Sequence, residues 1–406
     1  MGVLMKKRMR QWIGILLTVS IFFIGTSSLA RAGEREESLG ELHATCAVLM
    51  DGDSGRVLYG KEEETARPNA STTKVMTCIL ALELGEGDEK VQISARAAAQ
   101  PDVQLNLREG ETYYLEDLLY SLMLRSHNDT AVAIAEHIGG SVEEFAKLMN
   151  EKAREIGCEN THFVTPNGLD DSDEGGVHRT TARDLALIMR YAIANPTFLK
   201  ISQTREYSFS DISGKRQFVV INTNAFLDMM DGVIAGKTGF TADAGYCYVC
   251  AWQQDGRTLI VALLGCGWPN NKNYKWQDTR QLLTYGEEHY QLVSYWREPD
   301  LHTVTVQDGI PEDGELYEKA CVDLVCECPK EDKTEQILLG DKEKIQMRCQ
   351  TLAMLEAPVK AGTQVGTVSF YLDGKLFRQY PVVTRDTVEK ISFAWCVDQI
   401  FHRFFH

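Results

Sequence analysis

The hydrophobic residues of the chain change their spacing near residue 200. Before that point they recur three and four positions apart, as in Leu115, Leu118, Leu119, Leu122 and Met123, which is typical of a helix with one buried face. After it, continuous runs of β-prone residues predict strands. The expected helices cover residues 71–82, 115–125, 129–139, a segment from the capping box at 141–144 to Gly157, and a segment opened by Thr181; the expected strands cover 218–221, 246–252 and 258–264.

Strand-forming runs also lie ahead of the helical segments. Residues 44–50 and 56–59 flank a polar, glycine-containing turn and predict a hairpin. Strands at both ends of a helical middle predict an α/β layered domain with a largely antiparallel sheet, which we place at residues 33–298. Beyond it, short β-prone runs alternate with Gly and Asp turns, so residues 299–385 are expected to form a small β-rich domain.

Both ends of the chain carry apolar segments with distinct flanks. A basic cluster at 6–10 precedes the apolar run 12–24, and Ala30-Arg31-Ala32 has the small-x-small pattern of a signal-peptidase site. Residues 1–32 are therefore expected to be a signal peptide for export, with an uncleaved anchor as the alternative. Residues 386–406 mix aromatic residues with few charges and predict an amphipathic helix at a membrane, or one docked on its own domain.

Composition excludes several classes of protein. The chain has 406 residues, 44% hydrophobic and 25% charged, which is ordinary globular composition rather than collagen-like, low-complexity or multi-spanning membrane composition. Its formal net charge is −16, and −21 once the five basic residues of 1–32 are removed. An acidic chain of this kind lacks the basic face that nucleic acid requires, so no nucleic-acid partner is expected.

The eleven cysteines do not form the pattern of a small disulfide scaffold, because their number is odd. Cys247 and Cys250 have metal-type spacing, but they lie in a predicted strand where positions i and i+3 face opposite sides. We expect these two thiols to be buried. A later group can hold one disulfide, without an assignable pairing: Cys321, Cys326, Cys328 and Cys349.

Ser71 and Lys74 form the first candidate chemical pair. They lie three positions apart on a predicted helix, so both side chains project from one face and the amine can reach the hydroxyl. This pairs a nucleophile with a base, at a helix start whose N–H groups can stabilise an oxyanion. Alone the pattern is weak, since S-x-x-K occurs by chance about once in a chain of this size.

Two further motifs supply polar groups of the complementary kind. Ser126-His127-Asn128 follows a predicted helix and offers a hydroxyl and an amide that can orient a substrate or relay a proton. Lys237-Thr238-Gly239 precedes a predicted strand, and its cation and hydroxyl can hold a carboxylate while the glycine permits close backbone approach. Taken alone, the first motif is more typical of a helix cap than of a site, and the lysine of the second is typical of an ordinary surface lysine.

The order S-x-x-K, S-x-N, K-T-G is the motif set of penicillin-binding proteins and serine β-lactamases. With these motifs in place, the chain resembles the serine D-alanyl-D-alanine carboxypeptidases, the low-molecular-mass penicillin-binding proteins of peptidase family S11. The resemblance covers most of the first domain. It includes residues 67–74, 118–129, 161–169, 178–186 and 236–241.

The resemblance implies a penicillin-binding-protein or β-lactamase-like domain, with helices on both faces of an antiparallel sheet and a helical subdomain, followed by the β-rich domain. In such a site Ser71 attacks the bond between the last two D-alanines of a peptidoglycan stem peptide, and Lys74, neutral through burial and the charge of Lys237, takes its proton. The remaining implied roles are proton relay by Ser126, peptide positioning by Asn128, carboxylate binding by Lys237 and Thr238 with Gly239 completing the motif, and an oxyanion hole from the N–H groups of Ser71 and Phe240. No metal or cofactor is implied, and β-lactams are expected as covalent inhibitors.

Two residues depart from the family pattern. His127 stands where glycine is common, and we expect its ring to face solvent; Phe240 stands where some members have His. Other functions remain open beside the carboxypeptidase: a β-lactamase, a related endopeptidase or transpeptidase, and a catalytically silent antibiotic sensor or wall-binding protein. The expected location is the cell wall or the outer face of the cytoplasmic membrane.

Overall fold

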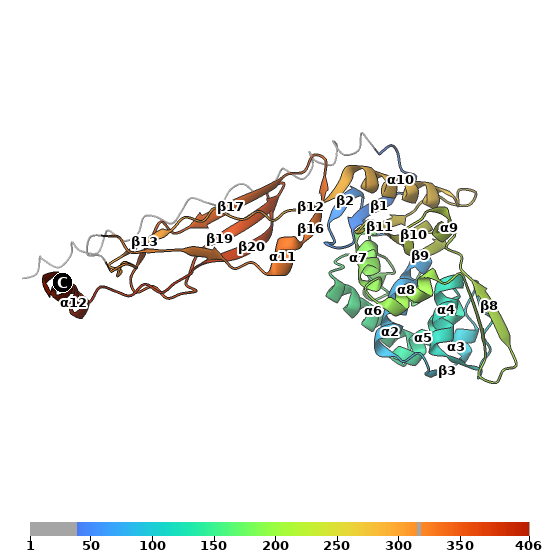
Figure 1. Ribbon diagram of the computed structural model, residues 1–406. Helices are drawn as coiled ribbons and strands as arrows, with labels where there is room; N and C mark the ends of the chain where they lie inside the picture. Colours follow the sequence, from blue (N-terminus) through green and yellow to red (C-terminus); the bar gives the residue numbers. More distant parts are fainter. Residues whose placement is uncertain (1–38, 315–317, 406) are drawn as a thin grey trace, which may run out of the picture. The chain divides into compact units, whose positions relative to one another are not determined.

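A five-stranded antiparallel sheet organises the first domain of the computed structural model, which describes residues 39–314 and 318–405 (Figure 1). The expected signal peptide lies outside these residues. The strand order is β2-β1-β11-β10-β9, so β9 is an edge strand. The strands are β1 (Cys46–Asp51), β2 (Val57–Lys61), β9 (Val233–Thr241), β10 (Gly245–Gln254) and β11 (Arg257–Leu264).

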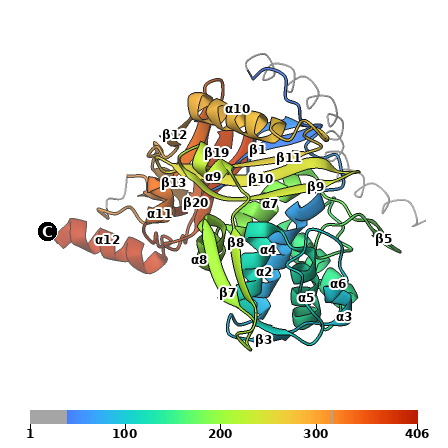
Figure 2. The same cartoon turned by 90° about the vertical axis from the view of Figure 1, so that its right-hand side faces the viewer.

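Helices cover both faces of this sheet. All six residues of β1 and seven of the eight in β11 are buried, as expected of strands with no solvent-facing side. Figure 2 shows α10 (Tyr274–His289) on one face and α7 (Ala182–Ala192) on the other. The layered α/β fold predicted from the sequence is confirmed.

Helices α2 to α6 pack below α7 as the helical subdomain, and α8 and α9 lie beside β9 (Figure 2). Ser141 Oγ accepts the Glu144 N–H at 3.1 Å and Thr181 Oγ1 accepts the Asp184 N–H at 3.0 Å, so both predicted caps are present. The elements of this part are η1 (Ala70–Thr73), α2 (Lys74–Leu84), β3 (Lys90–Gln92), α3 (Ala95–Ala98), β4 (Thr112–Tyr114), α4 (Leu115–Arg125), α5 (Asn128–Gly139), α6 (Val142–Ile156), β5 (Ser172–Asp173), β6 (Gly176–Val177), α8 (Pro196–Gln203), β7 (Glu206–Ser210), β8 (Gln217–Ile221) and α9 (Phe226–Met229).

The C-terminal part is rich in strands, as expected. One sheet has the order β15-β20-β19-β17, another the order β14-β13-β18, and β12 pairs with β16. Its core contains Val368, Phe370 and Val382, each fully buried. The elements are β12 (Tyr290–Ser294), β13 (Val304–Gln307), β14 (Cys321–Val322), β15 (Leu324–Cys326), α11 (Lys330–Thr334), β16 (Gln336–Gly340), β17 (Ile345–Thr351), β18 (Met354–Glu356), β19 (Gln364–Leu372) and β20 (Lys375–Thr384).

The tail forms the predicted helix, α12 (Phe393–Phe405). Phe393 and Phe404 expose more than four fifths of their surface. Among the described residues, no helix combines the length and the apolar character needed to cross a bilayer.

All eleven cysteines lie in the described residues as free thiols. Cys247 and Cys250 are buried on β10, as predicted, and burial raises the pKa of each thiol to about 12. The group around Cys326 forms no disulfide, so the one considered from the sequence is absent from this structure.

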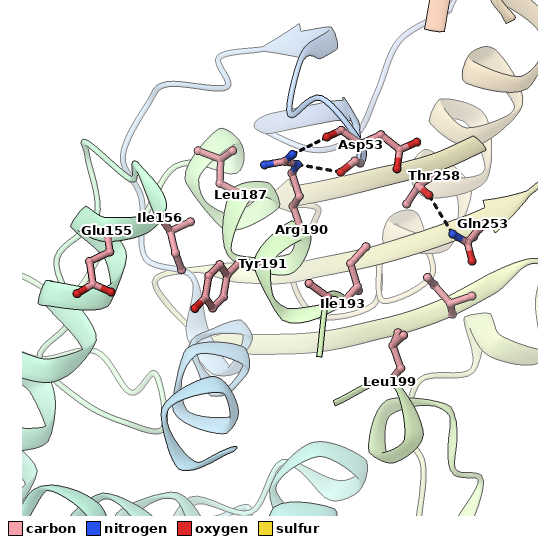
Figure 3. Close-up of a pocket in the computed structure, with 13 residues that line it drawn as sticks. Asp53, Glu155, Ile156, Leu187, Arg190, Tyr191, Ile193, Leu199, Gln253 and Thr258 are labelled. Atoms are coloured by element: carbon pink, nitrogen blue, oxygen red, sulfur yellow. Dashed lines mark hydrogen bonds between the residues drawn. The ribbon is translucent and has the colours of Figure 1, made fainter. Parts of the chain in front are cut away.

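A pocket opens beside α7, at the turn after β1 (Figure 3). There the Arg190 guanidinium donates to the Gly52 carbonyl at 2.8 Å and to the Asp53 carbonyl, which ties α7 to the hairpin. None of the residues predicted to carry chemistry lines this pocket. Those residues meet elsewhere, between α2, α5 and β9.

Candidate active site

Ser71 lies on a 3-10 turn, not on the α-helix expected over 71–82. The turn η1 covers Ala70–Thr73 and α2 begins at Lys74. The hydrogen bonds of Asn69 account for this difference. Its side-chain amide donates to both threonine hydroxyls of the turn, and its carbonyl accepts from Thr72 Oγ1 at 2.7 Å. Such local bonds compete with α-helical geometry and favour the tighter turn.

The tighter turn still brings Ser71 and Lys74 together. Lys74 Nζ lies 2.8 Å from Ser71 Oγ, 2.8 Å from Asn128 Oδ1 and 2.8 Å from the carbonyl oxygen of Asn167. Ser71 Oγ also lies 3.3 Å from that carbonyl. The amine is thus held against the nucleophile by two acceptors from other parts of the chain.

Lys74 is completely buried, and this decides its charge. Burial lowers its pKa well below the usual range, the positive charge of Lys237 lowers it further, and the Asp129 carboxylate opposes the shift. A lowered pKa favours the neutral amine, which is the form that carries a free lone pair. Lys74 can therefore accept the Ser71 proton.

Lys237 and Ser126 form the second half of the site. Lys237 Nζ lies 2.8 Å from Ser126 Oγ and donates to the Thr238 carbonyl at 2.8 Å. Burial lowers its pKa to about 7. Ser126 ends α4 in the left-handed region with φ of 66°, which turns the chain so that the next helix starts two residues later.

The edge strand β9 brings its K-T-G segment directly against the nucleophile. A Cβ at Gly239 would lie 2.9 Å from the Ser71 nitrogen, so only glycine permits this approach. Thr238 is half-buried, and Phe240 is 42% exposed with its ring 4.7 Å from that of Tyr246. All eight predicted site residues therefore gather where η1, the α4–α5 connection and β9 meet.

Asn167 is a site residue that the sequence did not single out. Its backbone carbonyl contacts both Ser71 and Lys74, and a backbone atom has no residue-type signature. Gly168 makes the approach possible, because a Cβ there would lie 1.9 Å from the Ala70 oxygen. The run 165–169 appears in the resemblance, but its role was not assigned.

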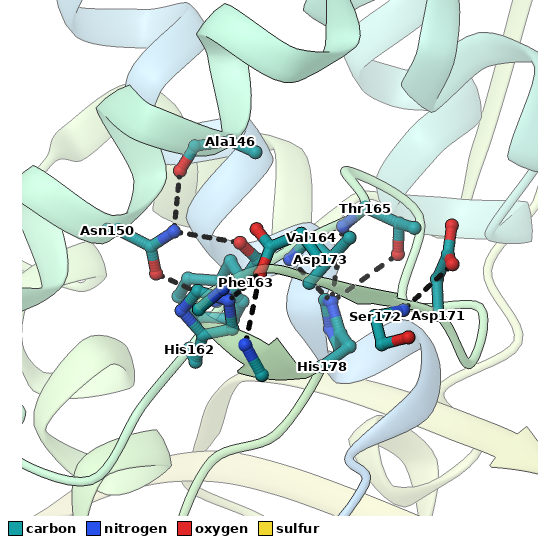
Figure 4. A network of polar contacts seen from close by, with 12 residues as sticks. Ala146, Asn150, His162, Phe163, Val164, Thr165, Asp171, Ser172, Asp173 and His178 are labelled. Carbon is teal, nitrogen blue, oxygen red and sulfur yellow. Dashed lines mark hydrogen bonds and ion pairs between the residues drawn. The ribbon is translucent and has the colours of Figure 1, made fainter.

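His178 supports this segment from behind (Figure 4). Its Nδ1 accepts the N–H groups of Val164 at 3.0 Å and Thr165 at 3.2 Å, so Nε2 carries the proton and donates to Thr73 Oγ1 at 2.8 Å. Burial lowers the pKa of His178 to about 3 and keeps the ring neutral. The ring joins η1 to the segment that carries Asn167.

Asp129 supports the other wall of the site. Its carboxylate accepts the N–H groups of Leu105 and Leu107, both at 3.0 Å. Asn128 anchors the same segment by donating from Nδ2 to the carbonyls of Pro101 and Asp102. The amide of Asn128 is thereby oriented with Oδ1 towards Lys74.

The expectation that His127 faces solvent is wrong. The side chain is 5% exposed, and Nδ1 lies 2.7 Å from Ser121 Oγ. The connection between α4 and α5 has only two residues, and with Ser126 left-handed the ring turns inward between the helices. The Ser121 hydroxyl on α4 pairs with Nδ1 there, which offsets part of the cost of burying the ring.

Comparison with known proteins agrees with this arrangement. Residues 32–267 match the family model of the D-alanyl-D-alanine carboxypeptidases, peptidase family S11, and residues 329–390 match the model of the penicillin-binding protein 5 C-terminal domain. The first match covers more than half of the chain. The chain belongs to the D-alanyl-D-alanine carboxypeptidase family.

Individual relatives cover most of the chain. It is 30% identical over 387 residues to the D-alanyl-D-alanine carboxypeptidase DacF of Bacillus subtilis, covering 94% of each. Penicillin-binding protein 5 of Haemophilus influenzae superposes with a TM-score of 0.66 at 26% identity, over 86% of this chain and 99% of the other. A variant of the Streptomyces K15 DD-transpeptidase superposes at 0.57 with 30% identity, over 61% and 99%.

Proposed function

We propose that the chain is a serine D-Ala-D-Ala carboxypeptidase that removes the terminal D-alanine from peptidoglycan stem pentapeptides and so limits cross-linking. The observation that carries the proposal is the buried Lys74 amine, 2.8 Å from Ser71 Oγ, with its pKa lowered by burial and by Lys237. Such a pair activates a serine without histidine or metal.

Acylation uses both halves of the site. Ser71 Oγ attacks the carbonyl carbon of the penultimate D-alanine, and its proton moves to Lys74 Nζ. The oxyanion accepts hydrogen bonds from the N–H groups of Ser71 and Phe240. Lys74 passes this proton through Ser126 to the amine nitrogen as the C–N bond breaks and D-alanine leaves, which regenerates the neutral Lys74 amine and the Ser126 hydroxyl. Lys237 and Thr238 hold the carboxylate of the leaving D-alanine.

Deacylation repeats the chemistry with water. Water gives a proton to the neutral Lys74 amine as it adds to the ester carbonyl, and Lys74 returns that proton to Ser71 Oγ as the ester C–O bond breaks. Asn128 keeps the peptide amide and Lys74 in register during both steps. A β-lactam enters the same path at acylation, so the chain is also expected to bind penicillin covalently.

The proposed place of action is outside the cytoplasm, at the wall or the outer face of the membrane. The basic and apolar start of the sequence supports export, and the exposed phenylalanines of α12 support peripheral membrane contact.

The test is intact mass spectrometry after benzylpenicillin treatment, combined with D-alanine release from diacetyl-Lys-D-Ala-D-Ala. The expected result is a lasting adduct on Ser71 and release of D-alanine. Ser71→Ala loses both, while Ser172→Ala, on an exposed hairpin, retains both.

Other outcomes separate the alternatives. Rapid loss of the adduct with drug turnover indicates a β-lactamase, and an adduct without peptide cleavage indicates a sensor. Transfer of the peptide to added glycine in place of water indicates a transpeptidase. Absence of any adduct would sink the assignment of Ser71.

A further inference from the structure

His127 lies between two residues that contact the site lysines. The connection from α4 to α5 consists of Ser126 and His127 alone. Ser126 Oγ lies 2.8 Å from Lys237 Nζ, and Asn128 Oδ1 lies 2.8 Å from Lys74 Nζ. A shift of this short segment would therefore displace both contacts at once.

The imidazole of His127 bonds directly to α4 and is linked to α5 through Ser121. Nδ1 is 2.7 Å from Ser121 Oγ on α4, and Ser121 Oγ is 3.1 Å from Thr130 Oγ1 on α5. All three side chains are buried, with exposed fractions between 0% and 5%. A buried polar network keeps its geometry because each broken bond leaves an unsatisfied group.

The identity of residue 127 is not explained by helix capping. His127 is the N-cap of α5, yet no side-chain hydrogen bond caps that helix. The side chain turns instead toward Ser121, one turn back on the preceding helix. Glycine, which is common at this position in the family that the chain resembles, would leave the hydroxyls of Ser121 and Thr130 without the imidazole.

The surrounding charges keep this network in one protonation state. Burial is the main cause that lowers the pKa of His127 to about 3, and the neighbouring basic side chains of Arg125, Lys74 and Lys237 add to the shift in whatever fraction they are protonated. The ring is therefore neutral at neutral pH and carries one N–H group and one lone pair. It adds no positive charge beside the site lysines.

We propose that His127 is a positioning residue, which fixes the 126–128 segment through Ser121 and thereby holds Ser126 on Lys237 and Asn128 on Lys74. The inference rests on the proposed function of this site. Misplacing a reacting group by about 1 Å costs on the order of 100-fold in rate, so loss of the tie acts on kcat and on acylation. Substrate binding through Lys237 changes less.

The test compares variants at position 127 whose side-chain amide takes the place of Nδ1 (Asn), lies further out (Gln) or is absent (Ala). In asparagine, as in histidine at Nδ1, the polar atom is bonded to Cγ, so His127→Asn can restore the bond to Ser121. His127→Gln places its amide one atom further out, and His127→Ala removes the group. His137→Ala, on α5 and paired with Glu89, is the matched control.

The measurements are the acylation rate constant with benzylpenicillin, and kcat and KM for D-alanine release, alongside Tm. We expect His127→Ala and His127→Gln to lower kcat and acylation about 10- to 100-fold with KM within about threefold, and His127→Asn to recover most of the loss. Ser121→Ala should reproduce the defect, and the double variant should be no worse than either single one. His137→Ala should behave as wild type.

Three results would overturn the inference. They are wild-type rates in a folded His127→Ala, equal defects in the Asn and Gln variants, or a fully active Ser121→Ala. If His127→Ala fails to fold, the Asn and Gln pair still decides. A wild-type protein that acylates without releasing D-alanine contradicts the proposed function, while acylation continues to test His127.

Discussion

Residues 42–289 and 290–390 bury very different side chains. The first region buries two lysines of the site, two histidines and Asp129, all below 6% exposure. In the described residues of the second region, the buried polar side chains are Ser369 and Thr384. Its core is otherwise apolar and aromatic, centred on Phe370.

The two regions therefore differ in what burial costs them in stability. Burying a charge costs several kcal/mol unless it is paired, so a core gains stability from apolar groups instead. Burial lowers the pKa of both Lys74 and Lys237, which is the property that the proposed mechanism requires of them. The C-terminal region has no such requirement and is built for packing.

The largest expected effect comes from removing the buried amine beside the nucleophile. Lys74→Ala should slow acylation by benzylpenicillin by at least about 10⁴-fold, because it removes both the base and an anchor of Ser71. Lys74→Arg should not restore the rate, since a guanidinium stays protonated. Stopped-flow or quenched mass spectrometry measures the rate.

Lys275 is the matched control for this substitution. It is also buried, burial lowers its pKa to about 8, and it packs over the rings of Tyr246 and Trp276. Lys275→Met should change Tm but leave the acylation rate within about threefold. Equal losses in both variants would show that any buried lysine matters, and the comparison would fail.

A substitution in the C-terminal core should have the opposite effect, lowering stability without changing the acylation rate. Phe370→Ala should lower the free energy of unfolding by about 3–5 kcal/mol, because a fully buried ring is replaced by a cavity. Urea unfolding followed by tryptophan fluorescence measures it. The acylation rate of the folded fraction should equal wild type, and a tenfold drop would mean that this region contributes to the chemistry.

The sequence indicated the fold best where local chemistry decides. The helix caps at Ser141 and Thr181 and the strands expected over 246–252 and 258–264 are confirmed, because local runs of residues favour them. The edge strand β9 was missed, since its K-T-G segment was expected to precede a strand and not to lie in one. The motif residues were found because their types carry the chemistry. Missed features depend on contacts between distant segments, as with the Asn167 carbonyl and the inward His127 ring.

Burial of Lys237 should make the stability of the folded chain depend on pH. Lys237 has a pKa of about 7 in the folded chain and an ordinary value near 10.4 when unfolded. Between these values the unfolded chain binds more protons, so this lysine makes stability rise with pH by up to about 1.4 kcal/mol per unit. Lys237→Met should lose that rise.

Denaturant unfolding of both proteins between pH 7 and 9.5 measures it. The stability of wild type relative to Lys237→Met should grow across this range, because the buried ammonium becomes a neutral amine. Below pH 7 Lys237 is protonated in both the folded and the unfolded wild-type chain, so the stability difference from Lys237→Met should stop changing with pH. Parallel curves throughout would contradict the lowered pKa and the view that burial has a cost here.

The smallest effect is expected at the tail helix α12, where apolar residues are exposed instead of buried. Phe401 is 58% and Phe404 81% exposed, three positions apart on one face. Burying a phenylalanine is worth about 1.5–3 kcal/mol, and interfacial burial is partial. Replacing both with serine should weaken binding to lipid vesicles about tenfold in co-sedimentation.

Salt and a matched substitution distinguish electrostatic attraction from apolar contact as the cause of that binding. Residues 386–406 contain Lys390 and Arg403 against three acidic residues, so attraction to anionic lipid contributes little. Binding should therefore change less than about twofold between 0.05 and 0.5 M salt, and Gln399→Ser should leave it intact. Binding that disappears in salt, or that survives loss of both phenylalanines, would show that the exposed apolar face of α12 is not what contacts the lipid.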